Sequence, residues 1–336
     1  PWNVKVMQEA LDASRECYGK WFGAYPWRDL KLTEFPGLAG YAQGFPGNIT
    51  FSESIGFLTR PGAADEVDVV FYVTAHEAGH QWWGNMLMPG KGLGGNILSE
   101  GLANYSALLL TLEKRGDEQR QRMLRQWEDD YCNMRSADSE RPMVRISGTI
   151  PGDSTVTYDK GGWVFWMLTQ VMGRERMLAG LQDFIRTYTN GPDYPLLQDF
   201  LVVMRRHATD LPAFDAFARQ WFESVVLPEF KLWDLKVTRP DADSWVVEGT
   251  LENVGSGTFT VEVGAEGQAP EPAKDAAADA KPPKAPRART QVAIGPEARV
   301  PFRVACPFEP VKAIVDPDVQ LLQLRRKLAE QPLPRS

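Results

Sequence analysis

His76-Glu77-Ala78-Gly79-His80 is the stretch that decides the fold, and it contains two of the 3 histidines in the chain. In a helix, residues four apart lie on one face about one turn apart, so both imidazoles can reach a single metal ion. Glu77, beside the first histidine, can then reach a water molecule next to that ion. Zinc hydrolases use this H-E-x-x-H arrangement, in which the histidines hold the metal and the glutamate is the general base. A surface helix with two unrelated histidines is the alternative.

The residues around the motif favour a buried helix. The segment 65–85 contains no proline, and its glycines are Gly79 and Gly84. Apolar residues surround the motif on most sides: Val67, Val70, Phe71, Val73, Ala75, Ala78, Trp82 and Trp83. A helix that is apolar all round is buried, and buried imidazole nitrogens need partners, of which a metal ion is one. A catalytic zinc ion takes three protein ligands and a water molecule, so we expect a third ligand downstream.

Glu100 is the candidate for this third ligand. Residues 89–96 are rich in glycine and predict a loop, and a second helix is expected over 97–113, with Ser99 near its start. The face that carries Glu100 also carries small residues such as Ala103, which would let this helix pack closely against the motif helix. An acid near a helix N-terminus is also favoured by the helix dipole alone, and this alternative stays open here.

Residues 76–106 resemble the zinc site of the alanyl aminopeptidase family of gluzincin metallopeptidases. The similar segments are HEAGHQWWGN, which contains the motif, and LSEGLANYS, which contains Glu100. In that family the third ligand is a glutamate in a turn of this kind. The resemblance therefore implies one zinc ion per chain, held by His76, His80 and Glu100.

A further segment supports the resemblance. The sequence YDKGG at 158–162 is similar to a family motif whose tyrosine stabilises the oxyanion of the reaction, and this role is carried to Tyr158. The resemblance covers roughly residues 10–228, with a weaker similarity near the C-terminus. Together with the two segments around the metal site, this motif makes the resemblance specific.

The interval between His80 and Glu100 departs from the usual pattern. It spans nineteen residues, 81–99, one more than is usual in the family, and the glycine loop can absorb the extra residue. This longer interval also resembles that of a bacterial branch of the family that is fused to multi-spanning ABC-type permeases. It raises the expectation that the full-length protein is tethered to a membrane permease and that this chain is a soluble fragment. The chain begins at Pro1 without a methionine, so we expect a fragment or processed product.

A fourth segment matches less closely. Upstream of the motif helix, the family carries G-x-M-E-N, whose glutamate binds the free amino group of the substrate. The corresponding stretch here is TFSESIGF at 50–57, so the resemblance assigns this role to Glu53. The leading glycine and the asparagine of the motif are replaced. An exposed glutamate on an edge strand is the alternative.

Length and composition limit the other possibilities. A chain of 336 residues is long enough for two domains, each with its own core. The formal net charge is −7, so no basic face for nucleic acid is evident. No apolar run approaches the length of a membrane span, and no secretory signal opens the chain. Cys17, Cys132 and Cys306 are odd in number and far apart, so they form neither a disulfide framework nor a metal site.

The predicted fold class is α+β. The resemblance implies a thermolysin-like zinc peptidase domain over 1–228, mainly helical, with a small sheet predicted from the short apolar runs in residues 30–60. After Pro228 the apolar periodicity changes to two, which predicts a β-sandwich domain over 229–323 and leaves a tail over 324–336.

The expected strands of the second domain are short and regularly spaced. They lie at 230–237, 244–251, 258–263, 290–294, 300–304 and 311–315. Residues 266–289 interrupt them with alanine, proline, lysine and acids. This composition cannot bury an apolar core, so we expect a mobile loop there.

These features predict a zinc metallopeptidase, and the resemblance implies an aminopeptidase that releases N-terminal residues from peptides. One alternative is a zinc endopeptidase with the same metal site, which would not use Glu53. An epoxide-opening hydrolase, known in one branch of the family, is a second. A non-catalytic, zinc-stabilised interaction module beside a transporter is the third. The presence of both Glu77 and Tyr158 argues against the third alternative, because folding requires neither residue.

Overall fold

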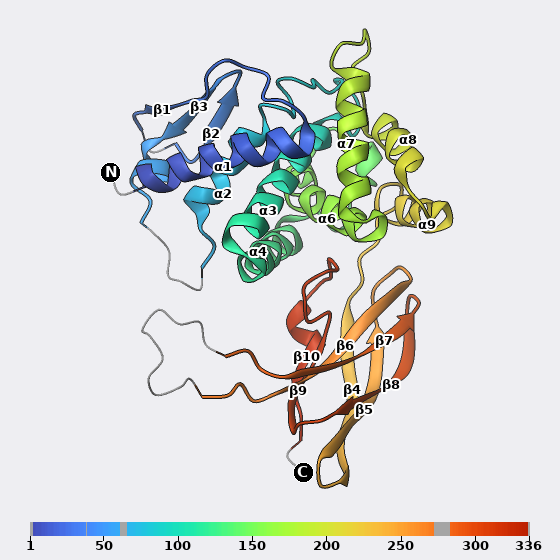
Figure 1. Cartoon of the computed structure of the whole chain (residues 1–336). Helices are drawn as coiled ribbons and strands as arrows, with labels where there is room; N and C mark the ends of the chain where they lie inside the picture. Colours follow the sequence, from blue (N-terminus) through green and yellow to red (C-terminus); the bar gives the residue numbers. More distant parts are fainter. Residues whose placement is uncertain (1–2, 38, 61–65, 272–282, 335–336) are drawn as a thin grey trace. The chain divides into compact units, whose positions relative to one another are not determined.

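The computed structural model describes residues 3–37, 39–60, 66–271 and 283–334. The chain divides into two compact units, Pro1–Val225 and Val226–Ser336, called here the N-terminal and C-terminal units (Figure 1). Each unit is described by itself. None of the helices in the described part of the chain combines the length and the apolar character that a membrane span requires.

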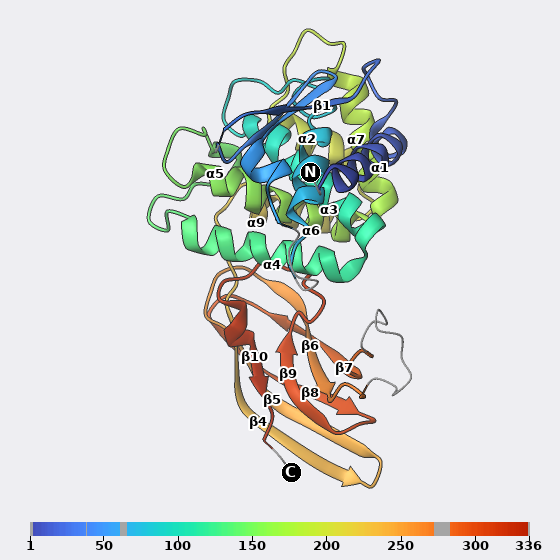
Figure 2. The same ribbon diagram turned by 90° about the vertical axis from the view of Figure 1, so that its left-hand side faces the viewer.

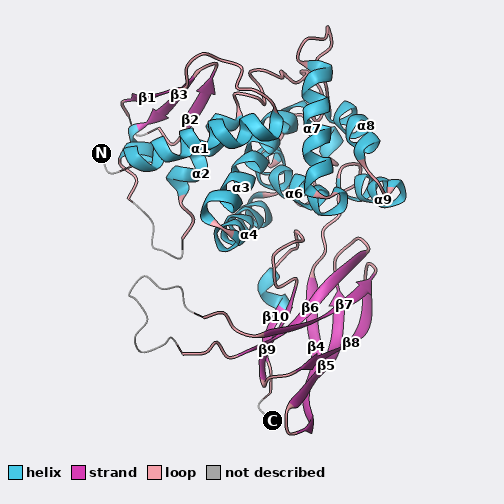
Figure 3. Ribbon diagram, in the orientation of Figure 1, coloured by secondary structure: helices cyan, strands magenta, loops and turns pink. Residues whose placement is uncertain are grey.

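The N-terminal unit is mainly helical, with a small sheet (Figure 3). Its helices are α1 (Val4–Phe22), α2 (Val69–Gly79), α3 (Leu102–Arg115), α4 (Asp117–Met134), α5 (Asp153–Thr155), α6 (Gly161–Met172), α7 (Arg174–Tyr188), α8 (Leu197–His207) and α9 (Leu211–Trp221). Three π-helical turns and one 3-10 turn join them: η1 (Glu53–Phe57), η2 (Ile97–Gly101), η4 (Val156–Lys160) and η3 (Met143–Arg145).

The sheet of the N-terminal unit has the order β1-β3-β2, so β2 is an edge strand. Its strands are β1 (Lys31–Phe35), β2 (Ala42–Phe45) and β3 (Asn48–Ser52). Strand β3 pairs parallel with β1 and antiparallel with β2. The small sheet predicted for residues 30–60 is therefore present.

Helix α2 carries the H-E-x-x-H motif and is buried on most sides, as its composition predicts. Asp68 caps its start, because the side chain accepts a hydrogen bond from the backbone N–H of Phe71 at 3.1 Å. Close packing against α3 is possible because both helices have small residues at the contact. A Cβ added at Gly79 would lie 3.2 Å from Cα of Ala103, so the two backbones nearly touch.

The second helix is present where the sequence pattern predicts it, but its first part is π-helical. An α-helix was expected over 97–113, but residues 97–101 form the π turn η2, and α3 begins at Leu102. A π turn is one residue wider than an α turn, and hydrophobic periodicity does not distinguish the two. The difference matters because η2 contains Glu100.

The C-terminal unit is built from antiparallel strands, which can be followed in Figure 2. They are β4 (Phe230–Asp241), β5 (Ser244–Asn253), β6 (Phe259–Gly267), β7 (Arg287–Ile294), β8 (Ala298–Cys306), β9 (Pro310–Val315) and β10 (Glu330–Pro332). One sheet has the order β10-β9-β6-β7 and the other β4-β5-β8. Phe230 of one sheet packs edge-to-face on Phe259 of the other, with ring centroids 6.2 Å apart. The α+β fold class with a β-sandwich is confirmed.

Two parts of this unit differ from the prediction. The loop expected over 266–289 is shorter, because β6 runs to Gly267 and β7 starts at Arg287. Charge pairing between the strand ends explains the difference, since Arg287 Nε donates to Glu266 Oε1 at 2.8 Å. Residues 272–282 of this expected mobile loop lie outside the described residues. Part of the expected tail is also ordered, because β10 pairs with β9.

Candidate metal centre

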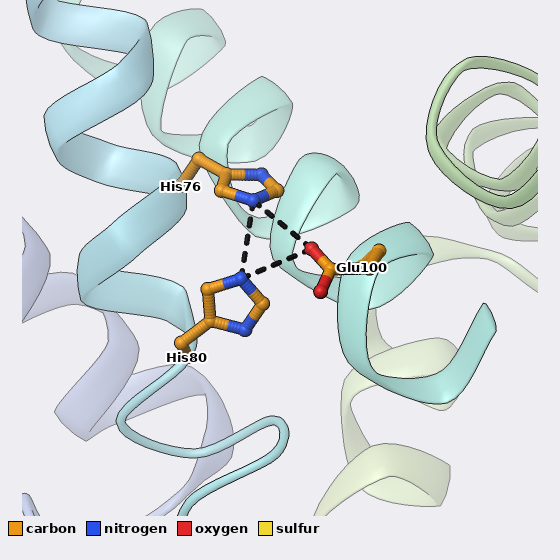
Figure 4. Close-up of side chains that lie close together, drawn as sticks. All are labelled: His76, His80 and Glu100. Atoms are coloured by element: carbon orange, nitrogen blue, oxygen red, sulfur yellow. Dashed lines mark hydrogen bonds and ion pairs between the residues drawn. The ribbon is translucent and has the colours of Figure 1, made fainter. Parts of the chain in front are cut away.

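Three side chains from two segments converge on one point (Figure 4). His76 lies in the last turn of α2, and His80 follows at its C-terminal end with helical backbone angles, so the four-residue spacing holds. Their Nε2 atoms are 3.1 Å apart. Oε2 of Glu100 lies 3.4 Å from Nε2 of His76 and 3.1 Å from Nε2 of His80. Within the described part of the chain, these residues are the group of potential metal ligands that meets at one place.

The spacing of these donor atoms suits zinc. Zn–N and Zn–O bonds of 2.0–2.1 Å place the ligands of a tetrahedral ion about 3.3 Å apart. The three separations between donor atoms here, 3.1, 3.1 and 3.4 Å, are close to that ligand–ligand distance. Glu77 adds a second observation: its Oε2 is buried and has no hydrogen-bond partner among the described residues. A zinc site with an adjacent water molecule would supply that partner.

Both histidines are oriented through their other ring nitrogen. Nδ1 of His80 lies 2.9 Å from the backbone carbonyl of Trp83, and Nδ1 of His76 lies 2.7 Å from Oδ1 of Asn104. Both partners are acceptors, so we assign the ring hydrogens to Nδ1. In the neutral form of each ring, this arrangement leaves the Nε2 lone pair for a metal ion, whereas a protonated Nε2 donates to Glu100 instead.

Glu100 and Tyr158 are both carried by π turns. Glu100 lies in η2 and Tyr158 in η4, and such turns occur frequently at functional sites. The two turns touch through glycines, because a Cβ added at Gly161 would lie 3.1 Å from Cα of Gly101. This contact brings Tyr158 to the metal ligands, with its ring stacked on that of His76 at 6.0 Å between centroids.

The charges of the cluster are strongly coupled. Burial opposes protonation of His80, but the hydrogen bond and charge of Glu100 outweigh it and raise the pKa of His80 to about 9. Burial likewise opposes ionisation of Glu100, but hydrogen bonds from both histidines hold its pKa well below the usual range. Burial and the charge of Glu100 raise the pKa of Tyr158 well above its usual range. Tyr158 is therefore a neutral hydroxyl donor at physiological pH.

The cluster opens into a cleft of about 550 Å³. One wall is the edge strand β2, which approaches the motif helix so closely that a Cβ at Gly44 would lie 2.6 Å from the carbonyl oxygen of Glu77. A second cavity of about 810 Å³ adjoins the cleft and shares Gly84, Ser99, Glu100 and Tyr158 with it. The two cavities leave room for an extended chain beside the metal ligands.

Glu53 lies elsewhere. It starts η1 just after β3, and its Oε2 accepts a hydrogen bond from the backbone N–H of Gly37 at 3.1 Å. It is not among the described residues that line the cleft, where the carboxylates are Glu77 and Glu100. The structure therefore brings Glu77 and Tyr158 to the three predicted ligands but does not bring Glu53 there.

Asn104 was not found by the sequence analysis, although it contacts His76 and the turn that carries Tyr158. One signal could have pointed to it. It follows Glu100 by four residues, which is the spacing of neighbours on one helix face. Its partners, however, come from other elements, so the spacing alone names no contact.

Comparisons with known proteins agree with this geometry. Residues 2–221 match the model of the Peptidase family M1 domain. A curated relative, human endoplasmic reticulum aminopeptidase 2, is 28% identical over 197 residues, which are 54% of this chain and 20% of the relative.

Solved structures show the same fold. One is aminopeptidase A of Legionella pneumophila in complex with aspartic acid. The match covers 96% of this chain and 35% of the Legionella chain, with a TM-score of 0.62 and 17% identity. The M1 zinc metallopeptidase of Deinococcus radiodurans matches 67% of this chain and 45% of its own, with a TM-score of 0.50 and 22% identity. The chain thus spans a fifth of the curated relative and less than half of either solved chain.

Proposed function

The chain belongs to peptidase family M1, and from this membership we propose that it is a zinc-dependent metallopeptidase that releases residues from the N-terminus of peptides. The observation that carries the proposal is the convergence of His76, His80 and Glu100 beside the unpartnered buried oxygen of Glu77. One zinc ion per chain is part of the proposal, because the described residues offer one such group of ligands.

Zinc, when bound, polarises the carbonyl of the scissile peptide bond and acidifies water. Glu77 is placed to take the proton of the attacking water, because the residue lines the cleft and its buried Oε2 has no competing partner among the described residues. The same carboxyl group can return that proton to the leaving amine, which makes Glu77 first a general base and then a general acid.

Tyr158 is proposed to stabilise the negative charge that develops on the carbonyl oxygen. Its raised pKa keeps the hydroxyl protonated, so it can donate a hydrogen bond at neutral pH. The residue is 39% exposed and lines both cavities, so a substrate in the cleft can approach it. A donor of this kind typically contributes about 3 kcal/mol to the transition state.

The restriction to N-terminal residues is supported by the relatives, two of which are named aminopeptidases. Glu53 was predicted to hold the ammonium group of the substrate, and this role stays a prediction. The position of Glu53 favours a second candidate function, the cleavage of internal peptide bonds. Among the described residues, the carboxylates that line the cleft are Glu77 and Glu100, which belong to the candidate metal centre.

One experiment separates the two candidates. A peptide with a free N-terminus and its acetylated form are offered to the zinc-loaded parent, to Glu53→Ala and to Glu77→Gln as a blank. We expect the free peptide to be cleaved faster by the parent and this preference to be reduced in Glu53→Ala. A preference that persists in Glu53→Ala would contradict the role predicted for Glu53, which is not among the described residues that line the cleft. Equal rates on both peptides would favour the endopeptidase. Parent activity no higher than that of Glu77→Gln would contradict both candidates.

We also propose that the whole protein carries this unit beside a membrane permease. The support is the interval of nineteen residues at 81–99, which resembles that of the bacterial branch fused to ABC-type permeases. Determining the complete reading frame that encodes the chain tests this proposal. A frame without membrane-spanning segments would contradict it.

A further inference from the structure

Asn104 is a buried polar residue that contacts two parts of the site at once. It lies in the first turn of α3 and is 0% exposed. Its Oδ1 accepts hydrogen bonds from Nδ1 of His76 at 2.7 Å and from the hydroxyl of Tyr72 at 2.8 Å. Its Nδ2 donates to the backbone carbonyl of Tyr158 at 2.8 Å. One carboxamide therefore bridges the motif helix and the turn that carries the tyrosine.

The orientation of this amide follows from its partners. The backbone carbonyl of Tyr158 can only accept, so the NH₂ group of Asn104 must face it and Oδ1 must face the other way. Oδ1 requires donors, which places the ring hydrogen of His76 on Nδ1 and leaves the Nε2 lone pair toward Glu100. An aspartate at this position would keep the acceptor and lose the donor. An alanine would lose both.

The surroundings of Asn104 leave the amide little room to move. A Cβ added at Gly162 of α6 would lie 3.1 Å from Cβ of Asn104 and 2.6 Å from the ring of Trp127, so the helices enclose it closely. Nδ1 of His80 instead lies 2.9 Å from a backbone carbonyl and 3.4 Å from the hydroxyl of Ser99. Among the described residues, Asn104 thus makes the shorter side-chain contact to the outer nitrogen of a candidate ligand.

We propose that Asn104 is a positioning residue that couples the metal ligand His76 to Tyr158. The proposal rests on the function proposed above. Its two halves are separable. The acceptor Oδ1 sets the tautomer and ring orientation of His76 and thereby zinc affinity, since such outer contacts typically contribute about 10–100-fold to metal affinity. The donor Nδ2 holds the η4 backbone and thereby the hydroxyl of Tyr158 at the scissile carbonyl.

The first measurement needs no turnover. Zinc affinity of the metal-free protein is determined by competition with a chromophoric chelator for the parent, Asn104→Ala and Asn104→Asp. Asn104→Ala should bind zinc about 10–100-fold more weakly, whereas Asn104→Asp should bind it as tightly as the parent because the acceptor remains. Unchanged affinity in Asn104→Ala, or equal losses in the two variants, would overturn this half of the proposal.

The second measurement uses the zinc-loaded enzymes. Asn104→Asp should lower kcat about 10²-fold with little change in KM, the loss that a displacement of about 1 Å at a reacting group can cause. In a Tyr158→Phe background the same substitution should have little further effect, because its action passes through the missing hydroxyl. An equal fall in kcat in both backgrounds would show that Asn104 acts in another way.

Tyr105→Phe is the matched control, because Tyr105 is the next residue of α3 and its hydroxyl is hydrogen-bonded to Thr169 at 2.7 Å, away from the ligands. It should change neither zinc affinity nor kcat. Circular dichroism and melting curves show whether each variant is folded, and Asn104→Ser replaces the alanine variant if that one is not. A parent without peptidase activity would refute the proposed function, while the zinc measurement would still decide the role of Asn104 toward His76.

Discussion

At the scale of single residues, the roles proposed for Glu77 and Tyr158 each depend on the protonation of one group. Oε2 of Glu77 is buried and unpartnered among the described residues, while the hydroxyl of Tyr158 is held neutral by burial and by the charge of Glu100. A base and a neutral donor beside the same candidate metal ligands are what peptide hydrolysis requires.

Glu77→Gln should lower kcat by about 10²–10⁴-fold, because an amide cannot accept the proton of the attacking water. Zinc content should stay the same, since Glu77 is not one of the three converging ligands. Peptide assays combined with metal analysis by atomic emission check both statements. Glu118→Gln, at an exposed position in α4, is the control for a change of charge. Loss of zinc from Glu77→Gln would show that this carboxylate belongs to the metal site.

Asp159, next to Tyr158, gives a prediction on pH. Burial raises the pKa of Asp159 to about 6 from an unfolded value of 3.8, so its neutral form is favoured in the folded state. The corresponding stability is present below pH 3.8 and is lost as the pH rises through about 6. The parent therefore carries a destabilising ionised carboxylate at pH 8.

Asp159→Asn removes that ionisation and keeps an oxygen that can accept the hydrogen bond from Thr155. With allowance for partial exposure, the variant should melt roughly 2–4 °C above the parent at pH 8, the shift that about 1 kcal/mol causes in a domain of this size. The difference should shrink as the pH falls toward 4. Melting curves across this range check it, and a difference that does not depend on pH would exclude titration of Asp159 as the cause.

At the scale of elements, the candidate site depends on the close contact between two π turns. Turn η2 presents Glu100 and turn η4 presents Tyr158, and they meet where neither Gly101 nor Gly161 has a side chain. Helix α2 meets α3 in the same way at Gly79. The ligands and the tyrosine are therefore brought together by close backbone contacts, which small residues permit.

Gly161→Ala should destabilise the protein by about 1–3 kcal/mol, because the added methyl group needs space that the Gly101 backbone occupies. Its kcat should also fall, since the displaced turn carries Tyr158. Gly19→Ala is the matched control: it lies inside α1 with nothing within 4 Å of the added Cβ. It should stabilise the protein by about 0.5–1 kcal/mol, as alanine does in a helix interior. Denaturant unfolding of both variants checks that their free energies of unfolding change in opposite directions.

At the scale of the whole molecule, the metal centre belongs entirely to the N-terminal unit, and the C-terminal unit is a sandwich with its own apolar core. The long connection between β6 and β7 starts and ends in a charged pair, because Glu266 accepts from Arg287 and also lies 2.9 Å from Lys312 of β9. These pairs mark where the sandwich ends and the connection begins.

Replacing residues 270–284 with a short glycine-serine turn should leave both peptidase activity and melting temperature close to those of the parent. This segment is rich in alanine, proline and charged residues and lies beyond the paired strand ends. Replacing 266–289 should instead cost about 2–3 kcal/mol, because it also removes strand pairs and the Glu266 ion pairs. Equal stability of the two replacements would show that the strand ends contribute nothing to the stability of the sandwich. Lost activity after replacement of 270–284 would show that the connection contributes to the site.

The sequence by itself determined the features that depend on local periodicity. His76 and His80 share a face because a helix repeats every 3.6 residues, and Glu77 follows from the same spacing. The strands after Pro228 follow from alternation of apolar residues. The loop and helix pattern made Glu100 the candidate third ligand and the resemblance supported this choice, and the structure places its carboxylate within 3.4 Å of both histidines.

Only the tertiary structure decided which distant residues meet. Glu53 fits a motif in sequence, yet it is not among the described residues that line the cleft, whereas Asn104, to which the sequence assigned no role, bridges His76 and Tyr158. The π turns also escaped the sequence pattern, because one extra residue in a turn changes neither composition nor periodicity enough to be seen. Such contacts depend on the packing of segments far apart in the chain, and local propensities do not contain that information.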